Sequence, residues 1–591
     1  MAGRRQLDAP RGARIATVIS LLGLLLALSA SLRAQDFASE TARLAAAQAA
    51  FNAGEWDEAA NFARGPAEQS ADLDLVEGLA LARLQLWKDA RAALEAGHRK
   101  APNDPRFPME LAGVAYKQND FGRAKRELHE ALRLNPEDTY AREFLGTIYF
   151  LENNLEAALK YWNGVEKPRL QAVNFSPEPV LKDKLLAHAV AFNAPQVLNR
   201  DSLLATQARL DNLGVFPQQR IALAPTDGEN YDATIHLSER NGWGDSKLEG
   251  LLSVLSGLPY ATVYPEYYNL GHASVNFNSL ARWDSEKRRF SGSLSTPLYH
   301  DPSLRLQVYF DARNENWNLS QTFFGAGAPL TDLNMRRTAG GAEFHSVENG
   351  LWGWSAGFEI ANRSFRNTDS NTSTAAKPFF TDSTSLASWL AGQRALLRAP
   401  EHRFTLDASA ELRAGRDFAS ALGAFATARG SLLARWFPRA TGDDYEMQAQ
   451  VRAGGTVGKT PLDELFQLGI ERDNDLWLRG HVGTANGRKG SAPLGRRYFL
   501  ANWEMDKNVY HAGFFTMKFG PFIDNGAVAD SSGLFGSRHW LIDAGFQCKM
   551  RVLNGVSIVV SYGRDLRGAR RRLRHRPSLT GGKLPITKGH Q

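Results

Sequence analysis

Cysteine, long apolar runs and catalytic motifs are scarce in this sequence. Cys548 is the only cysteine among 591 residues, which excludes an internal disulfide and a cysteine-based zinc cluster. No HExxH, GxSxG or Walker-loop motif occurs, and the histidines are scattered singly. Beyond the first 34 residues no apolar run is long enough to cross a bilayer as a helix. We therefore expect no catalysis, no cofactor and no metal, and a membrane location only as a β-barrel.

The N-terminus has the pattern of an export signal. Four arginines between Arg4 and Arg14 precede the apolar run Ile15–Leu32, which ends in small residues at Ala34. A basic lead, an apolar stretch and a small-residue exit are typical of a secretory signal peptide, here residues 1–34. The alternative is a retained membrane anchor, since such a run could just span a bilayer.

Residues 36–168 are rich in Ala, Leu, Glu and Lys at helical spacing, and they repeat. Ala71–Asp104 can be laid over Pro105–Asp138, so that Ala90 falls on Ala124, Leu94 on Leu128 and Pro102 on Pro136. A period of 34 residues with small residues at helix crossings resembles the tetratricopeptide repeat, a helix-turn-helix unit. Arrays of this kind usually bind partner proteins on a concave surface.

Residues 169–240 predict a small α+β domain. The expected strands and helices are Arg169–Phe175, Val180–Phe192, Ser202–Leu213, Gln218–Ala224 and Tyr231–Glu239. This order of strand, helix, helix, strand and strand resembles a POTRA module, the periplasmic domain in front of certain outer-membrane barrels. A generic α+β domain is the alternative.

Residues 245–566 predict a transmembrane antiparallel β-barrel of about 16 strands. Segments such as Leu304–Arg313, Phe404–Arg413 and Tyr445–Ala453 alternate strictly between apolar and polar residues. Each is long enough to cross a bilayer as a tilted strand, with the apolar face toward lipid and the charged face toward a wet lumen. Asn486–Pro493 is expected to be a surface loop. A soluble β-sandwich is the rival, because its strands are also one-faced.

One set of residues is more specific. Leu478, Arg479, Gly480 and His481 lie in a long loop, Glu504 lies on a later strand, and Phe522, Asp524 and Gly526 follow in the segment Phe-Ile-Asp-Asn-Gly. In order and spacing they resemble the core signature of the BamA and two-partner-secretion superfamily, also called bacterial surface antigens. In that family a Val-Arg-Gly-Phe/Tyr loop tip folds back into the lumen. At the first and last positions of that motif this sequence has Leu478 and His481 instead of valine and an aromatic residue.

The resemblance implies where these residues meet and what the chain does. Arg479 would contact Glu504 and Asp524 on the barrel wall. The family implies insertion of barrels into the outer membrane or secretion of polypeptides, without a nucleotide. Partners would be outer-membrane lipid and client polypeptides or periplasmic proteins, with the repeat arm recruiting them in the periplasm. Alternatives are a passive exopolysaccharide export porin and a soluble β-rich scaffold.

The last segment, residues 567–591, does not fit a barrel. It is strongly basic from Arg567 to Arg576 and lacks an aromatic end. A run this basic cannot face lipid. An earlier strand could close the barrel, the tail could be a solvated extension, or the reading frame could have slipped, which we favour. Much of the net charge of +7 lies here, so no nucleic-acid-binding face is expected.

Overall fold

The computed structural model describes residues 40–567 and 578–580, except 67–68, 228–229, 245–249, 253, 255–256, 259–260, 320–330, 369–371, 373, 375, 420–422, 440–443, 472, 513–514, 531–532, 538 and 553–555. The predicted signal peptide and most of the basic tail lie outside these residues. The chain divides into two compact units, residues 1–148 and 149–591.

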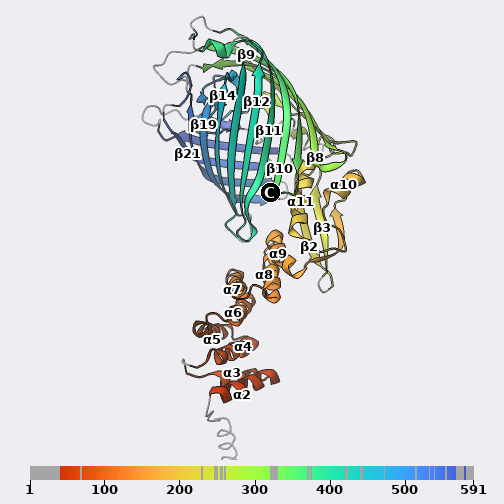
Figure 1. The fold of residues 1–591 in the computed structure, drawn as a ribbon, viewed down its shortest axis with the longest axis vertical. Coiled ribbons are helices and arrows are strands. Elements are labelled where there is room, and N and C mark those ends of the chain that lie inside the picture. The colour runs from red at the N-terminus through yellow and green to blue at the C-terminus, as the bar shows by residue number, and fades with distance from the viewer. Residues whose placement is uncertain are drawn as a thin grey trace, which may run out of the picture. The chain divides into compact units, whose positions relative to one another are not determined.

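The first unit is a stack of antiparallel helix pairs (Figure 1). Its helices are α2 (Glu40–Ala53), α3 (Trp56–Ala63), α4 (Ala71–Arg83), α5 (Trp87–Lys100), α6 (Arg106–Lys117), α7 (Phe121–Leu134) and the greater part of α8 (Thr139–Leu151). The helices α5 and α7 begin at Trp87 and Phe121, which keeps the expected 34-residue period. Leu81, Leu94 and Phe107 are buried in the core that the pairs share.

Two glycines in these helices differ in how closely their neighbours pack. A Cβ atom added at Gly78 on α4 would lie 2.5 Å from Cγ of Leu94 on α5, a fully buried side chain. Gly113 on α6 has no neighbouring atom within 4 Å of the same position. The first glycine is therefore needed for close helix packing, whereas the second is not.

We predict that the same substitution at these two glycines has opposite effects. Gly78→Ala should destabilise the helical unit by about 1–3 kcal/mol, because the methyl group overpacks the core. Gly113→Ala should stabilise it by about 0.5–1 kcal/mol, since alanine is the better helix former. Thermal melts of the full-length chain, followed by helical circular dichroism, measure both. Equal midpoints for the two variants would contradict the packing described.

The second unit begins with α9 (Leu155–Trp162) and a small α+β layer. This layer contains β1 (Arg169–Ser176), α10 (Asp183–Ala189), α11 (Arg200–Leu213), β2 (Gln218–Pro225) and β3 (Asn230–Ser238). The sheet order is β1-β3-β2, with β1 parallel and β2 antiparallel to β3. The expected elements are found, although α10 is shorter than the helix predicted over 180–192. Gly214 ends α11 in the left-handed conformation, at φ 69°.

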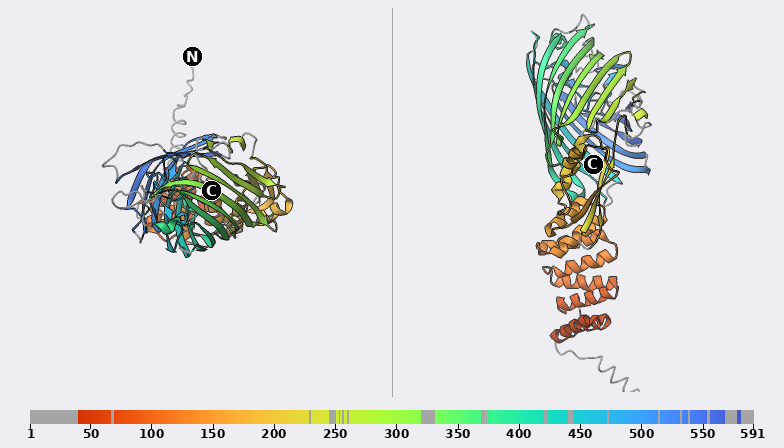
Figure 2. Two further views of the ribbon diagram at one scale, coloured as in Figure 1. Left: turned by 90° about the horizontal axis from the view of Figure 1, so that it is seen from above. Right: turned by 90° about the vertical axis from the view of Figure 1, so that its right-hand side faces the viewer.

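A large antiparallel sheet forms the rest of the second unit and curls around an inner space (Figures 1 and 2). Its main strands are β4 (Thr262–Val263), β5 (Glu266–Leu270), β6 (Val275–Trp283), β7 (Lys287–Leu298), β8 (Asp301–Asn318), β9 (Asp332–Val347), β10 (Trp352–Arg366), β11 (Ser383–Ala399), β12 (Phe404–Asp417), β13 (Ala424–Trp436), β14 (Tyr445–Gly458), β19 (Arg497–Ala512), β20 (Phe515–Ala529), β21 (Leu541–Val552) and β22 (Val556–Asp565). Each pairs with the next along the chain, apart from β4, which pairs with β6 beside β5. Among the described helices, none is long and apolar enough to cross a membrane.

A short fragment lies between β22 and β4 in the strand order of the sheet. The three-residue strand β23 (Ser578–Thr580) pairs with β22, beyond the basic segment. The described residues therefore do not reach about 16 full-length strands, and they contain no full-length strand after β22. This agrees with the loss of the alternating pattern near Arg567.

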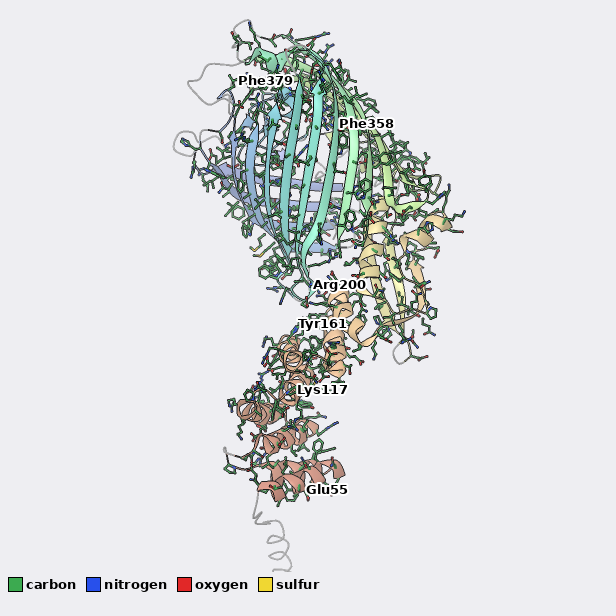
Figure 3. The ribbon with its side chains drawn as sticks, viewed as in Figure 1. Glu55, Lys117, Tyr161, Arg200, Phe358 and Phe379 are labelled. Carbon is green, nitrogen blue, oxygen red and sulfur yellow. The ribbon has the colours of Figure 1, made fainter. Side chains whose placement is uncertain are left out.

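The two faces of the sheet reverse the usual distribution of polarity. On β10, Phe358 (labelled in Figure 3) and Ile360 are 48% and 54% exposed, whereas Glu359 and Arg363 between and beyond them are 6% and 1% exposed. The same exposure of outward apolar residues recurs around the sheet, at Phe290, Val308, Phe310, Phe344, Leu386, Leu390, Leu412, Leu432, Phe519, Ile523 and Phe546. Charged residues thus line the inside and apolar residues the outside, as in a membrane barrel.

Polar contacts fix α9 and α11 to one end of this sheet. Asn154 donates to the Pro400 carbonyl oxygen at 2.7 Å, and Lys160 pairs with Glu401 in the turn between β11 and β12. Glu156 accepts from both Arg200 at the start of α11 and Arg398 on β11. The front of the second unit is therefore held against the strand turns by side chains from several elements.

Candidate functional site

The long connection between β14 and β19, residues 459–496, folds into the space inside the curled sheet. We call it the inner loop. Its short elements are η6 (Leu462–Glu464), β15 (Phe466–Gln467), β16 (Thr484–Ala485), β17 (Arg488–Lys489) and β18 (Leu494–Gly495). It contacts β6–β10, β12 and β19–β22, strands far apart around the sheet, which is possible only from the inside.

This placement corrects the expectation of a surface loop at Asn486–Pro493. Lys489 in this segment is 4% exposed and pairs with Asp473 at 3.0 Å and Glu315 at 2.7 Å. The prediction was wrong because a charged, glycine-rich segment suits a polar lumen as well as it suits bulk solvent.

Arg479, at the tip of the inner loop, is held by a two-pronged contact with Asp524. Its Nε and Nη2 atoms donate to the two carboxylate oxygens of Asp524 at 2.9 and 2.7 Å, and its backbone N–H donates at 2.9 Å. Arg479 is 5% exposed and Asp524 is 0% exposed. A planar guanidinium matches a carboxylate in this geometry better than a lysine could.

The remaining nitrogen of Arg479 reaches two further strands. Nη1 donates to Glu504 on β19 at 2.8 Å and to Gln547 on β21 at 2.7 Å. Lys549 also pairs with Glu504 at 2.5 Å, so this carboxylate is shared by two cations. One side chain of the loop thereby links three neighbouring strands, β19, β20 and β21.

Apolar packing, a cation–π contact and a close backbone approach at Gly480 also hold the tip of the inner loop against the wall. Leu478 is completely buried among apolar side chains that include Tyr498 and Leu500. The Arg479 guanidinium lies 3.8 Å from the centre of the Phe522 ring, within cation–π range. A Cβ atom at Gly480 would lie 2.6 Å from the Asp543 carboxylate, so the backbone approaches the wall where a side chain would collide.

The wall facing the tip presents a row of aspartates. Asp524 on β20 is the register partner of Asp543 on β21, which is the partner of Asp565 on β22. Like charges directly opposite one another destabilise a sheet unless something compensates them. Arg479 compensates the first member, while Gly480 N–H and His481 Nδ1 reach Asp543 at 2.5 and 3.1 Å.

Two further charge clusters hold the inner loop to the opposite wall. In one, Asp473 pairs with Arg282 at 3.2 Å, with Arg289 and with Lys489. In the other, Asp463 accepts from Arg337 at 2.9 Å and from Arg363 at 2.5 Å. In both clusters loop acids meet wall arginines, the reverse of the Arg479 contact. In the first cluster the loop also supplies Lys489, which pairs with Glu315 on β8.

Space remains beside the inner loop. A polar cavity of about 630 Å³ is lined by Arg289, Asp311, Arg313, Glu359 and Arg413, among others. A second cavity of about 950 Å³ lies at the end of the sheet that carries α9, lined by residues including Glu156 and Arg398. The interior is therefore partly filled and lined by charged residues rather than being an apolar core.

The structure brings together most of the wall and loop residues that the sequence motif selected. Arg479 contacts Glu504, Asp524 and the Phe522 ring directly, and Leu478 is buried beside the tip. Gly526 lies on the same strand as Asp524. His481 also lies at the wall, although it departs from the family pattern. Gln547, Asp543, Asp565, Asp473 and Asp463 were missed, because no local motif marks them.

Comparison with known proteins gives loose structural likeness only. BamA from Haemophilus ducreyi lacking POTRA domains 1–3 has 11% sequence identity and a TM-score of 0.39, over 67% of this chain and 81% of that one. CdiB from Escherichia coli has 13% identity and a TM-score of 0.42, over 68% and 73%. CdiB from Acinetobacter baumannii has 12% and 0.39, over 77% and 83%. No family model and no curated protein sequence matches the chain.

We predict that removing the acids of the inner loop opens the lumen. The double variant Asp463→Asn and Asp473→Asn removes the carboxylates through which the loop holds wall arginines, at a cost of roughly 3–5 kcal/mol for each broken buried pair. Arg337, Arg363 and Arg289 keep their other carboxylate partners. The loop should then leave the wall and raise single-channel conductance in planar bilayers several-fold.

The matched control is Asp444→Asn, which breaks an exposed pair with Arg439 outside the inner loop. Its conductance should equal that of the unaltered chain. Heat-modifiable gel migration checks that each variant is folded. An unchanged conductance in the folded double variant would show that the inner loop does not obstruct the lumen.

Proposed function

We propose that this chain is an outer-membrane barrel of the BamA and two-partner-secretion type, which inserts or secretes polypeptides. The observation that carries the proposal is the docking of the Arg479 tip on Asp524 and Glu504, inside a sheet with a charged interior and an apolar exterior. It is the arrangement that the sequence motif implies for this family. No chemical step on a substrate is part of the proposal.

The exterior of the sheet supports a location in the outer membrane. Exposed phenylalanine, leucine and isoleucine side chains on successive strands would be costly in water, but they suit the hydrocarbon core of a bilayer. In that setting the sheet would close as a barrel, since an open strand edge in lipid leaves backbone groups without partners.

The two parts in front of the barrel then take periplasmic roles. We propose that the helical pairs of residues 36–168 are tetratricopeptide repeats that recruit client or partner proteins. Residues 169–240 act as a POTRA module, whose β1-β3-β2 sheet can pair a client strand at its edge. The contacts of α9 with the β11–β12 turn and of Asn212 on α11 with the start of β8 would keep this module beside the barrel entrance.

The inner loop favours polypeptide handling over passive polysaccharide export. A passive pore needs a permanently open path, whereas here one loop is tied to three sectors of the wall through buried ion pairs. Moving such a loop requires an incoming partner that supplies free energy. Folding of a client polypeptide can supply it.

We predict that Arg479→Ala in the native cell depletes a set of outer-membrane or secreted proteins. The substitution leaves Asp524 without its cation and Glu504 with Lys549 alone, so the loop tip loses its ion pairs with β19 and β20. Quantitative mass spectrometry of outer-membrane and culture-medium fractions measures the loss. The matched control is Arg429→Ala, whose pair with Glu411 is partly exposed and should matter little.

A second strain lacking residues 36–148 separates the arm from the barrel. Its barrel should still insert, and the same proteins should be depleted. Unchanged protein levels in both strains, together with loss of extracellular polysaccharide, would refute the proposal in favour of an export porin.

A further inference from the structure

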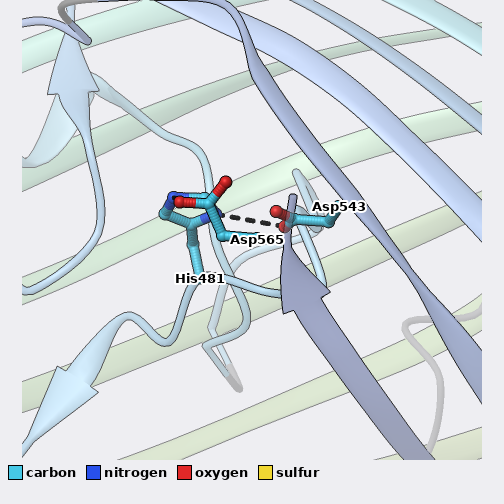
Figure 4. A group of neighbouring side chains, drawn as sticks. All are labelled: His481, Asp543 and Asp565. Atoms are coloured by element: carbon cyan, nitrogen blue, oxygen red, sulfur yellow. Dashed lines mark hydrogen bonds and ion pairs between the residues drawn. The ribbon is translucent and has the colours of Figure 1, made fainter. Parts of the chain in front are cut away.

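The loop tip places His481 between two aspartates from different strands (Figure 4). Its Nδ1 atom lies 3.1 Å from Asp543 Oδ2 on β21, and its Nε2 atom lies 3.8 Å from Asp565 Oδ2 at the end of β22. The two aspartates are direct partners in the strand register. Three segments far apart in the sequence thus meet at one point.

The charge balance of this group is incomplete. Asp543 is 0% exposed, and neither it nor Asp565 forms an ion pair with a lysine or arginine within the described part of the chain. The Oδ1 atom of Asp543 is buried there without a hydrogen-bond partner. A buried carboxylate that faces a second carboxylate needs a positive partner. Arg479 supplies one to the neighbouring Asp524, but it makes no ion pair with Asp543.

We propose that His481, Asp543 and Asp565 bind a divalent transition-metal ion of the Zn²⁺ class. One donor atom from each residue lies within 4.8 Å of the other two. Zinc bonds of about 2.0–2.2 Å place tetrahedral donors roughly 3.3 Å apart. The side chain of Asp565 is 29% exposed, so it has room to turn and make the remaining approach.

The donor set decides the class of ion. An imidazole nitrogen beside two carboxylates suits zinc and similar metals, whereas calcium and magnesium prefer oxygen alone. A charge of +2 balances the two carboxylates, and the metal can also take Oδ1 of Asp543. No metal was expected from the sequence, because the three donors share no spacing motif.

The bound ion would attach the loop tip to the end of the sheet. Asp565 is the last residue of β22, and only the three-residue β23 pairs beyond that strand. A link from His481 to β21 and β22 therefore stabilises the part of the sheet that has the least strand pairing. The site does not depend on the proposed function.

The test is zinc binding by the full-length protein in detergent. After chelator treatment and desalting, the protein is dialysed against ZnCl₂, and bound zinc is counted by mass spectrometry. We expect one tightly held ion per chain and a rise of several degrees in the midpoint of heat-modifiable migration at saturating zinc.

Two variants each remove one metal donor and leave the buried Asp543 unchanged. His481→Gln and Asp565→Asn should each lose the ion and the shift, whereas His402→Gln, in the turn between β11 and β12, should keep both. Failure of the unaltered protein to retain zinc overturns the proposal. Equal retention by His481→Gln and the unaltered protein also overturns it, because the ion would then be bound elsewhere.

Discussion

A buried guanidinium is the constraint on which the interior depends. Arg479 is 5% exposed, and its nitrogens are used by Asp524, Glu504 and Gln547 on three adjacent strands. A charge so far from water is tolerated only with paired charges and full hydrogen bonding. Its partners must therefore stand in fixed register, and the loop that carries it must enter the lumen.

The rest of the inner loop follows from that entry. Once the tip is seated, Asp473 and Asp463 lie against arginines of the opposite wall, and Lys489 bridges loop and strand. Loop acids meet wall arginines on β6, β7, β9 and β10, whereas the loop bases Lys489 and Arg479 meet wall acids on β8 and on β19 and β20. Such complementarity fixes one orientation of the loop, and each removed partner leaves another charge buried.

Much of this arrangement could be predicted from residue patterns, but its register could not. Strict alternation located strands such as β8 and β12, and the 34-residue period located the helix pairs. The motif joined Arg479 to Glu504 and Asp524. By contrast, the pairing of Asp543 with Asp565 depends on the register between β21 and β22, which local sequence does not specify. The prediction from polar composition was also wrong at Asn486–Pro493, because polar residues are found both in a charged lumen and at a surface exposed to solvent.

The coupling between Arg479 and Asp524 is the most direct measure of this account. A double-mutant cycle with Arg479→Met and Asp524→Asn, followed by urea unfolding in detergent micelles, gives the interaction free energy. If the loop tip is seated as described, each single variant is strongly destabilised and the double variant recovers part of the loss. The predicted coupling is about 2–3 kcal/mol. Additive effects with a coupling near zero would mean that the guanidinium and the carboxylate are not in contact. The described docking of the inner loop on β20 would then be wrong.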